Sequence, residues 1–318
     1  MNCTASVLMS IFNETAEQIK ESVASVLSQD FNNFELIIIL DNPERTDVEK
    51  LIIDFNDSRI VFKKNDNNVG LAISMNKAAR LANSDIFIRM DADDMCLPGR
   101  FKREIEILQT ERYDFVFSNY DEIDGNSIVI KEAKKEDDIT DSRDLYKMIS
   151  LDPSIIHHPT VIFTRAIFEK AGCYRNFPCS QDSDLWLRMA ECGCRYYKIG
   201  QSLLRYRVNP NSVSNKRWYQ QQLTCHYIFE LSIQRLINGK DNYSMDSYNL
   251  YLKRFNVDDE HAKIHLQKAV DNLALSSIAM SNGKLMQSFW LKIKVVLTSR
   301  VYRRHVYYLL KKKTLIRK

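Results

Sequence analysis

Glycine and proline are scarce in this chain of 318 residues, which contains 8 and 6 of them, respectively. This composition excludes collagen-like, low-complexity and disordered chains. No apolar run approaches the roughly 18 to 20 residues of a membrane-spanning helix, and no apolar export segment follows Met1. We therefore expect a globular protein that stays in the cytoplasm, built as one large domain with an appendage or as two domains.

The seven cysteines lack the pattern of a disulfide framework or of a zinc site. Their number is odd, and Cys173, Cys179, Cys192 and Cys194 are separated by six, thirteen and two positions. Zinc sites usually repeat a paired CxxC spacing, which these intervals do not. We expect reduced thiols.

Basic residues gather at the C-terminal end of the chain. The net charge is +4, yet residues 284–318 contain eleven Lys or Arg residues and no acid, so residues 1–283 carry −7. A basic tail on an acidic body indicates a polyanionic partner, which is either nucleic acid or anionic lipid.

Short apolar runs alternate with helical patterns over the first 120 residues. The runs that predict strands are 6–12, 34–40, 59–62, 85–90 and 114–117, and the segments with helical spacing are 15–27, 48–55, 70–82 and 100–109. This βαβ order predicts an α/β fold with a mainly parallel sheet and helices on both faces. In such sheets, ligands bind beyond the carboxyl ends of the strands.

In the second half of the chain, the alternation of predicted strands and helices gives way to helices. A strand is predicted over 160–164 and a helix over 182–193, and from about Asn215 onward the spacing is helical almost throughout. We therefore predict an α/β domain over residues 1–214 and a helical C-terminal region over residues 215–318.

Three acids follow the predicted strand 85–90 at once: Asp91, Asp93 and Asp94. Their carboxylates repel one another, so a cation is expected to offset that repulsion. Oxygen ligands favour Mg²⁺ or Mn²⁺, with coordination positions left for phosphate oxygens. The alternative is that the acids only cap the helix that begins near Pro98.

Asp41 directly follows the predicted strand 34–40. A carboxylate at this position can accept a hydrogen bond from a base or from a ribose hydroxyl. Asp-Asn-Pro is equally a turn sequence, so the alternative role is purely structural.

Asp182 lies at the start of the predicted helix 182–193, with Asp184 in the same turn. The helix dipole would keep a carboxylate ionised there, as a general base requires. The same acids would also complement the dipole without any chemistry, and spacing alone does not choose between the two.

His157 and His158 precede Pro159 and a strand. Adjacent side chains in extended backbone point to opposite faces, so the pair is a poor chelate and at most one histidine faces the site.

Several segments, in one order, resemble a known family. They are SVLMSIFNE with SVLSQDF, NNVGLAISMNKAARLA, MDADD, HPTVIF, QDSDLWLRM and LLRYRVNPNSVS. Together they resemble the family 2 glycosyltransferases with the GT-A fold, over roughly residues 5–215. Two departures are Gln181, where the family usually has Glu, and Asn42-Pro43, where it usually has a second acid followed by Gly-Ser.

The resemblance implies an inverting transfer of one hexose from a nucleotide diphosphate sugar, most often a UDP-sugar, to a saccharide hydroxyl. Residues 1–214 would then be the nucleotide-sugar-binding catalytic domain. The implied roles are Asp182 as catalytic base, Asp41 and Asp91 in nucleotide binding, Asp93 as ligand of Mn²⁺ or Mg²⁺, and His158, Asp184, Arg205 and Arg207 as further possible site residues.

The family also implies a setting. We expect a lipid-linked saccharide acceptor in surface polysaccharide synthesis, such as O-antigen or capsule. An enzyme of this kind would lie in the cytoplasm, peripheral on the inner face of the cell membrane, and would not bind nucleic acid.

Three other classes were compared with this interpretation. Processive polysaccharide synthases carry a Gln-x-x-Arg-Trp segment, whereas Arg217-Trp218 is preceded here by Ser214. Sugar-phosphate nucleotidyltransferases usually have a Gly-rich phosphate loop after the first strand, and SIFNETAEQ contains no Gly. The interpretation as a nucleic-acid-binding protein is supported only by the basic tail.

The tail also has an apolar stripe at helical spacing, which comprises Met286, Phe289, Trp290, Ile293 and Leu297. Aromatic and basic residues, including Arg300, Arg303, Arg304, Tyr307, Tyr308 and Lys311 to Lys313, suit the headgroup region of an anionic membrane. The alternative is that the stripe packs on the catalytic domain and the charges are solvated.

Overall fold

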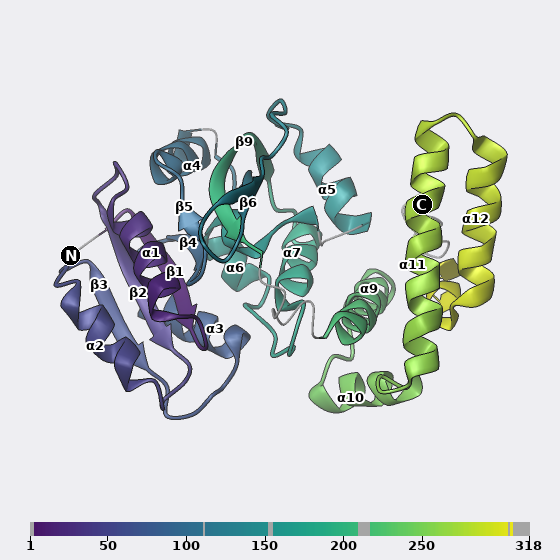
Figure 1. Cartoon of the computed structure of the whole chain (residues 1–318), viewed down its shortest axis with the longest axis horizontal. Helices are drawn as coiled ribbons and strands as arrows, with labels where there is room; N and C mark the ends of the chain where they lie inside the picture. Colours follow the sequence, from purple (N-terminus) through teal and green to yellow (C-terminus); the bar gives the residue numbers. More distant parts are fainter. Residues whose placement is uncertain (1–2, 111, 152–154, 209–216, 305, 308–318) are drawn as a thin grey trace. The chain divides into compact units, whose positions relative to one another are not determined.

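The computed structural model describes residues 3–110, 112–151, 155–208, 217–304 and 306–307. The chain divides into two compact units, residues 1–212 and 213–318 (Figure 1). The boundary predicted at residue 214 and the loop part of LLRYRVNPNSVS lie in 209–216, outside the described residues. Each unit is described by itself.

The N-terminal half of the sheet in residues 1–212 is parallel. Its strand order is β3-β2-β1-β4, where β1 is Ala5–Ile11, β2 is Phe34–Leu40, β3 is Ile60–Lys64 and β4 is Ile86–Asp91. Every residue of β1 and β2 is buried, as expected for strands with helices on both faces. The prediction of a parallel sheet is confirmed for this half.

The other half of the sheet is mixed. β8 (Val161–Thr164) runs antiparallel to both β4 and β6 (Phe115–Ile123), and β9 (Tyr196–Arg207) runs parallel to β6. Two short strands, β5 (Met95–Cys96) and β7 (Val129–Lys131), pair antiparallel with β9 and β6. The chain segment that carries the three acids therefore leaves β4 and immediately joins the opposite part of the sheet through β5.

Helices cover both faces of the sheet, as predicted (Figure 1). Alternate residues of β2 enter different cores: Ile38 faces one and Ile37 the other. The first core is completed by α1 (Ala16–Leu27), α2 (Thr46–Asp54) and α4 (Arg100–Thr110), and the second by α3 (Leu71–Leu81), α5 (Ser142–Leu151), α6 (Arg165–Lys170) and α7 (Gln181–Glu191).

Aromatic packing fixes α7 against the sheet. The ring of Trp186 lies 4.8 Å from that of Phe115 on β6 and 5.8 Å from that of Phe163 on β8. Pairs of this kind contribute about 0.5 to 1.5 kcal/mol each beyond the area they bury. The first turn of α7, which carries Asp182, is thereby held at a defined position relative to the sheet.

Residues 213–318 are helical in their described part. The helices are α9 (Trp218–Asn238), α10 (Met245–Arg254), α11 (Glu260–Ser281) and α12 (Leu285–Thr298). α11 and α12 form an antiparallel hairpin that reverses at Gly283, whose φ of 72° suits glycine (Figure 1). Among the described helices, none has both the length and the apolar character needed to span a bilayer.

The charged connection 132–144 lies along β9. The Ile139 N–H donates to Lys198 O at 2.9 Å, and Asp138 Oδ1 accepts from the Gly200 N–H at 2.8 Å. A Cβ atom at position 200 would overlap the carbonyl oxygen of Glu136 and lie 2.6 Å from its carbonyl carbon. Only glycine allows this close approach.

Gly200→Ala should therefore lower the free energy of unfolding by about 1 to 3 kcal/mol, because one backbone segment must move to admit the methyl group. Gly125→Ala is the matched control, since an added Cβ there meets no atom within 4 Å. Urea titration of both variants measures the difference, and equal stability of the two would contradict the packing described here.

Candidate active site

Three carboxylates, those of Glu14, Asp91 and Asp93, gather where β1 and β4 end. Asp91 is the last residue of β4 and lies opposite Ser10 of β1. The pKa of Asp93 is raised to about 7, first by burial and then by the negative charges of Asp91 and Glu14. Burial likewise raises the pKa of Glu14, to which Asp91 also contributes. The site thus concentrates negative charge at the carboxyl edge of the sheet.

Asp94 is fully buried beneath this edge. Its Oδ1 accepts from the backbone N–H of Arg207 at 2.8 Å, while its Oδ2 has no hydrogen-bond partner. Burial raises the pKa of Asp94 well above its ordinary range, and Asp93 and Asp91 add to the effect. Capping of α4 falls instead to Gln29 Oε1, which accepts from the Phe101 N–H at 3.3 Å. The helix-capping alternative for the three acids is therefore not what the structure shows.

A buried guanidinium lies directly behind the acids. Arg89, on β4, forms an ion pair through Nη2 with Asp91 and donates from Nε to His158 Nε2 at 3.2 Å. His158 Nε2 also lies 2.8 Å from the hydroxyl of Tyr174. Burial and the charge of Arg89 hold the pKa of His158 well below its usual range. His158 is therefore neutral, with Nε2 accepting from Arg89 beside the hydroxyl of Tyr174, in the 3₁₀ turn His158–Thr160 that precedes β8.

Asp182 approaches this network from α7. Its pKa is raised to about 6, chiefly by burial and also by the charge of Asp91, while the guanidinium of Arg89 acts in the opposite direction. The backbone N–H of Ser183 favours the ionised form. Tyr174, which bonds to His158, also experiences the charge of Asp182. The predicted base and the first acid of the predicted metal motif thus share one electrostatic environment.

Asp184 occupies a different environment. Its carboxylate is completely buried, and its Oδ2 lies 2.7 Å from Arg188 Nη2. Arg188 also donates to the carbonyl oxygens of Ala171 and Cys173. Asp184 therefore anchors α7 to the turn that follows α6, which is a structural task.

Asp41 is buried at the end of β2, and its carboxylate binds the chain itself. Oδ1 accepts from Asn65 Nδ2 at 2.8 Å and from the Val69 N–H at 2.9 Å, and Oδ2 accepts from the Gly70 N–H at 2.8 Å. These bonds fix the turn that leads into α3. The structural role is thus established by geometry, while recognition of the base remains a prediction.

Arg205 and Arg207 are two positions apart on β9 and so point to the same face of the strand, but their guanidinium groups have different surroundings. All five N–H groups of Arg207 donate within the protein, to backbone oxygens of Asp93, Asp124 and Gly125 and to the side chains of Glu21 and Ser127. This leaves none for a diphosphate. We assign Arg207 to positioning the MDADD turn, which corrects the expectation that its guanidinium binds a ligand.

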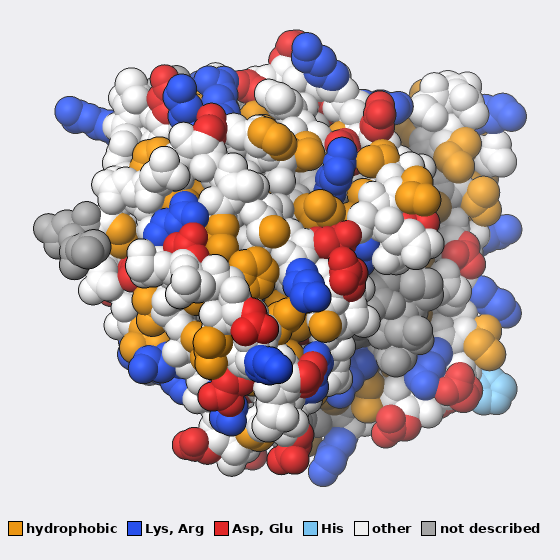
Figure 2. All heavy atoms as spheres, turned by 60° about the vertical axis from the view of Figure 1, so that its left-hand side comes forward, with side chains coloured by type: hydrophobic (Ala, Val, Ile, Leu, Met, Phe, Trp, Pro, Cys, Tyr) orange, Lys and Arg blue, Asp and Glu red, His pale blue; other side chains and the backbone are white. Residues whose placement is uncertain are grey.

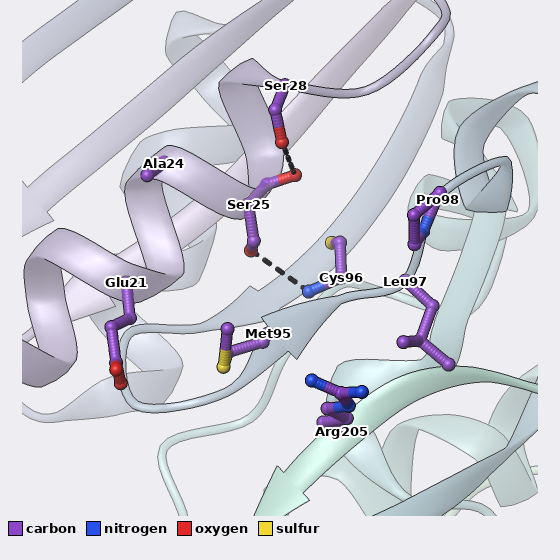
Figure 3. A pocket seen from close by; sticks show the side chains of 9 residues that line it. All are labelled: Glu21, Ala24, Ser25, Ser28, Met95, Cys96, Leu97, Pro98 and Arg205. Atoms are coloured by element: carbon purple, nitrogen blue, oxygen red, sulfur yellow. Dashed lines mark hydrogen bonds between the residues drawn. The ribbon is translucent and has the colours of Figure 1, made fainter. Parts of the chain in front are cut away.

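Arg205 borders a hollow of about 580 Å³ between α1, β5 and β9 (Figure 3). Its buried Nε has no hydrogen-bond partner. Ser25, on the opposite wall, accepts a hydrogen bond from the Cys96 N–H at 2.9 Å. The residues that line the hollow include none of Asp41, Asp93 and Asp182, so we do not assign the donor sugar to it.

Sequence reasoning missed three members of the site: Glu14, Arg89 and Tyr174. A signal existed for Arg89, because a cation inside the apolar run IFIRM must find buried partners. No comparable pattern marks Tyr174, which lies 16 positions from His158 in sequence. The contact between Tyr174 and His158 depends on α6, which lies between them in sequence and reverses the direction of the chain.

The carboxylates of this site fit a hard divalent cation that the protein and a substrate would bind together. Within the described ranges, no three His, Cys, Asp or Glu side chains are close enough to hold a metal by themselves. Mg²⁺, however, usually takes only one or two carboxylates from the protein and completes its shell with water and substrate phosphates. The crowding that raises the pKa of Asp93 and the unpartnered Oδ2 of Asp94 are consistent with this arrangement.

Known proteins resemble the chain in sequence and fold. The family model "Glycosyl transferase family 2" matches residues 6–172, more than half of the chain. An uncharacterized glycosyltransferase of Methanocaldococcus jannaschii is 31% identical over 225 residues, which cover 70% of this chain and 77% of that protein. The O-antigen biosynthesis glycosyltransferase WbnJ of Escherichia coli is 26% identical over 221 residues, 69% of this chain and 85% of WbnJ.

A solved structure supports the same fold. S. aureus TarS, crystallised in complex with UDP-GlcNAc, superposes with a TM-score of 0.59 at 16% identity and covers 79% of this chain and 71% of that one. The predicted α/β architecture with a helical C-terminal region is confirmed. With its parallel β3-β2-β1-β4 core, its acids at the end of β4 and the family match over residues 6–172, this chain belongs to the family 2 glycosyltransferases with the GT-A fold.

Proposed function

We propose that the chain is an inverting, metal-dependent hexosyltransferase. It moves one sugar from a nucleotide diphosphate sugar, specifically a UDP-sugar, to a hydroxyl of a saccharide acceptor. The observation that carries the proposal is the buried network in which Arg89 pairs with Asp91 and donates to His158, whose Nε2 lies 2.8 Å from the hydroxyl of Tyr174, a group that also experiences the charge of Asp182. A base and a diphosphate-binding motif at one sheet edge are what a single displacement requires.

In this mechanism, Asp182 accepts the proton of the acceptor hydroxyl as that oxygen attacks the anomeric carbon. A pKa of about 6 leaves the carboxylate ionised at neutral pH and more basic than an ordinary aspartate. Asp93 would hold Mn²⁺ or Mg²⁺, which when bound stabilises the charge of the departing diphosphate. Asp91, fixed by Arg89, orients the ribose or the ion, and Asp41 contacts the base.

Asp184 does not compete for the role of base, because its carboxylate is fully buried and paired with Arg188. This difference supports Asp182. The two acids are only two positions apart, yet the charge of Asp91 raises the pKa of Asp182, whereas Asp184 is paired with Arg188 inside the domain.

The donor and acceptor are inferred from similar proteins. TarS was crystallised with UDP-GlcNAc, which supports a nucleotide-sugar donor. WbnJ is named for O-antigen biosynthesis, which supports a saccharide acceptor in surface polysaccharide synthesis. We propose that this acceptor is lipid-linked and that the enzyme is cytoplasmic and peripheral on the inner face of the cell membrane.

Nucleic acid is not a partner in this proposal. Figure 2 shows a face of the molecule on which acidic and basic side chains are interspersed rather than gathered by sign. Binding to a phosphate backbone requires a continuous basic surface.

Replacing Asp93 tests the metal. Asp93→Ala should lower turnover by roughly 10³-fold, since it removes the proposed protein ligand of the ion. EDTA should reproduce this loss in the wild type, with Mn²⁺ or Mg²⁺ restoring the wild type but not the variant. Asp54→Ala, at the exposed end of α2, is the control and should stay active. Full activity after demonstrated metal removal would refute metal dependence.

Replacing Asp182 tests the base. Asp182→Asn should lower transfer by about 10² to 10⁴-fold while UDP binding survives, because shape is kept and basicity is lost. The wild-type rate should rise with pH up to about 6 and then level off, since the proton that blocks the base leaves at its raised pKa. Measured pH profiles of kcat should show this rise only in the wild type.

Asp184→Asn is the matched control for that experiment. It should lower the melting temperature, because Arg188 loses its buried partner, and should reduce kcat of the folded enzyme less than Asp182→Asn does. The reverse order of the two effects on kcat would assign the base to Asp184.

Replacing Arg89 tests the buried network. Arg89→Met should lower the free energy of unfolding by about 3 kcal/mol and should also lower kcat at saturating donor, because Asp91 loses its orientation. Arg165→Met is the control: the Arg165 side chain donates to the carbonyls of Ala79, Ala82 and Ser84 and pairs with Asp85 and Glu169, none of which belongs to the candidate site, so its loss should affect stability but not kcat. Wild-type kcat in Arg89→Met would limit Arg89 to a structural role.

A further inference from the structure

α11 and α12 pack through small side chains. The buried residues of the two helices are mostly small: Ala269, Ser276 and Ala279 on α11 and Ser288 on α12, with Leu266 and Val295 as the larger ones. Ser276 Oγ lies 2.8 Å from Ser288 Oγ, so the two helices are close at this point. Because the helices are this close here, the space between them at this point is too narrow for the large apolar side chains of α12.

Those large residues are exposed instead. Met286 is 69% exposed, Trp290 57% and Leu297 68%, and Leu285 and Phe289 are exposed as well. At about 100° per residue they occupy one face of α12, roughly 140° wide, opposite the buried Ser288 and Val295. The stripe predicted from the sequence therefore lies on the outside of the hairpin. An exposed apolar face of this extent marks an interaction surface.

The charges around this face have one sign. At the same helical spacing, Lys292 and Lys294 fall on its two edges, and Lys284 precedes its first turn. All three lysines are exposed, and none forms an ion pair within the part of the chain that the structure describes. α12 contains no acid.

Two other cations of the tail are already engaged inside this unit. Arg304 pairs with Glu230 of α9, and Arg303 donates to Leu297 O at 2.8 Å at the end of α12. Tyr308 and Lys311 to Lys313, which the sequence also assigned to the basic tail, lie outside the described residues. A third cation, Arg300, has its guanidinium over the ring of Phe255 at 5.8 Å. Lys284, just before α12, and Lys292 and Lys294 on it are thus the described lysines of the tail that remain for a partner.

We propose that the exposed face of α12 docks on an anionic lipid surface, with Phe289 and Trp290 at the level of the headgroups and the flanking lysines on their phosphates. Aromatic side chains with a polar edge and lysines with long apolar stems both suit this boundary. A second copy of the chain fits less well, because two such faces in twofold contact would bring lysines of like charge together.

This docking surface deepens the proposed function, since it would hold the enzyme where a lipid-linked acceptor is found. Its test measures binding without turnover, so docking and sugar transfer can fail independently. α12 lies entirely outside the residues 6–172 that match the family model. None of Asp41, Asp93 and Asp182 is altered by a change on α12.

Sedimentation with vesicles tests the proposal on the full chain. Wild type should bind vesicles of phosphatidylcholine and phosphatidylglycerol at low salt, should bind phosphatidylcholine vesicles at least tenfold less, and should be released as ionic strength rises. The double variant Phe289→Ser, Trp290→Ser should lose at least tenfold in partition. Lys292→Gln with Lys294→Gln should remove the preference for phosphatidylglycerol.

Leu250→Ser on α10 is the matched control, because Leu250 is 70% exposed but lies off the α12 face. It should leave the partition unchanged. Brominated lipid should quench Trp290 in the wild type, and that part of the quenching should be absent from Trp290→Phe, which keeps the fold.

Equal partition of the wild type and the Phe289→Ser, Trp290→Ser variant would overturn the proposal. So would an apparent mass in light scattering that falls from dimer to monomer in that variant without any vesicle binding by the wild type, which would assign the face to a second copy. Deleting residues 299–318 tests the docking surface less specifically than these substitutions, because it also removes Arg304 and with it the ion pair between Arg304 and Glu230.

Discussion

The buried guanidinium of Arg89 is the interaction on which the active-site edge depends. It lies inside a β-strand, where an unpaired charge would be very costly, and it is offset by Asp91 and by the neutral ring of His158. Arg100, itself buried, donates to the carbonyl oxygens of Arg89 and Pro159 and so joins β4 to the turn that presents His158. Removing Arg89 would unpair groups from β4 and from the turn before β8 at once.

A cost in stability accompanies this arrangement. Glu14, Asp93, Asp94 and Asp182 all have pKa values raised by burial, so ionising each of them costs more free energy in the folded protein than in water. Carboxylates collected in this way are suited to bind a cation or to accept a proton, and sites with such shifts are often functional. Arg207, with all its donors used inside the protein, keeps the acidic turn in place despite the repulsion.

The helical unit obeys a different constraint. Its hairpin buries mostly small residues on α11 and α12, together with Leu266 and Val295, and leaves Leu285, Met286, Phe289, Trp290 and Leu297 exposed, whereas a helix that covers a core buries such residues. The catalytic chemistry and the proposed docking surface therefore lie on separate units of the chain, and each can be altered without changing residues of the other.

The sequence by itself determined the elements, because apolar spacing and turn chemistry act over a few residues. The strands that end at Leu40 and Asp91, the acids that follow them and the helix that carries Asp182 were all predictable. Only the tertiary structure decided which of Asp182 and Asp184 is available, that β8 enters the sheet antiparallel, and that Arg207 serves the protein rather than a ligand. Each of these depends on partners brought together by packing, such as Arg89 and His158, which are 69 positions apart. Local patterns carry no information about such distant pairs.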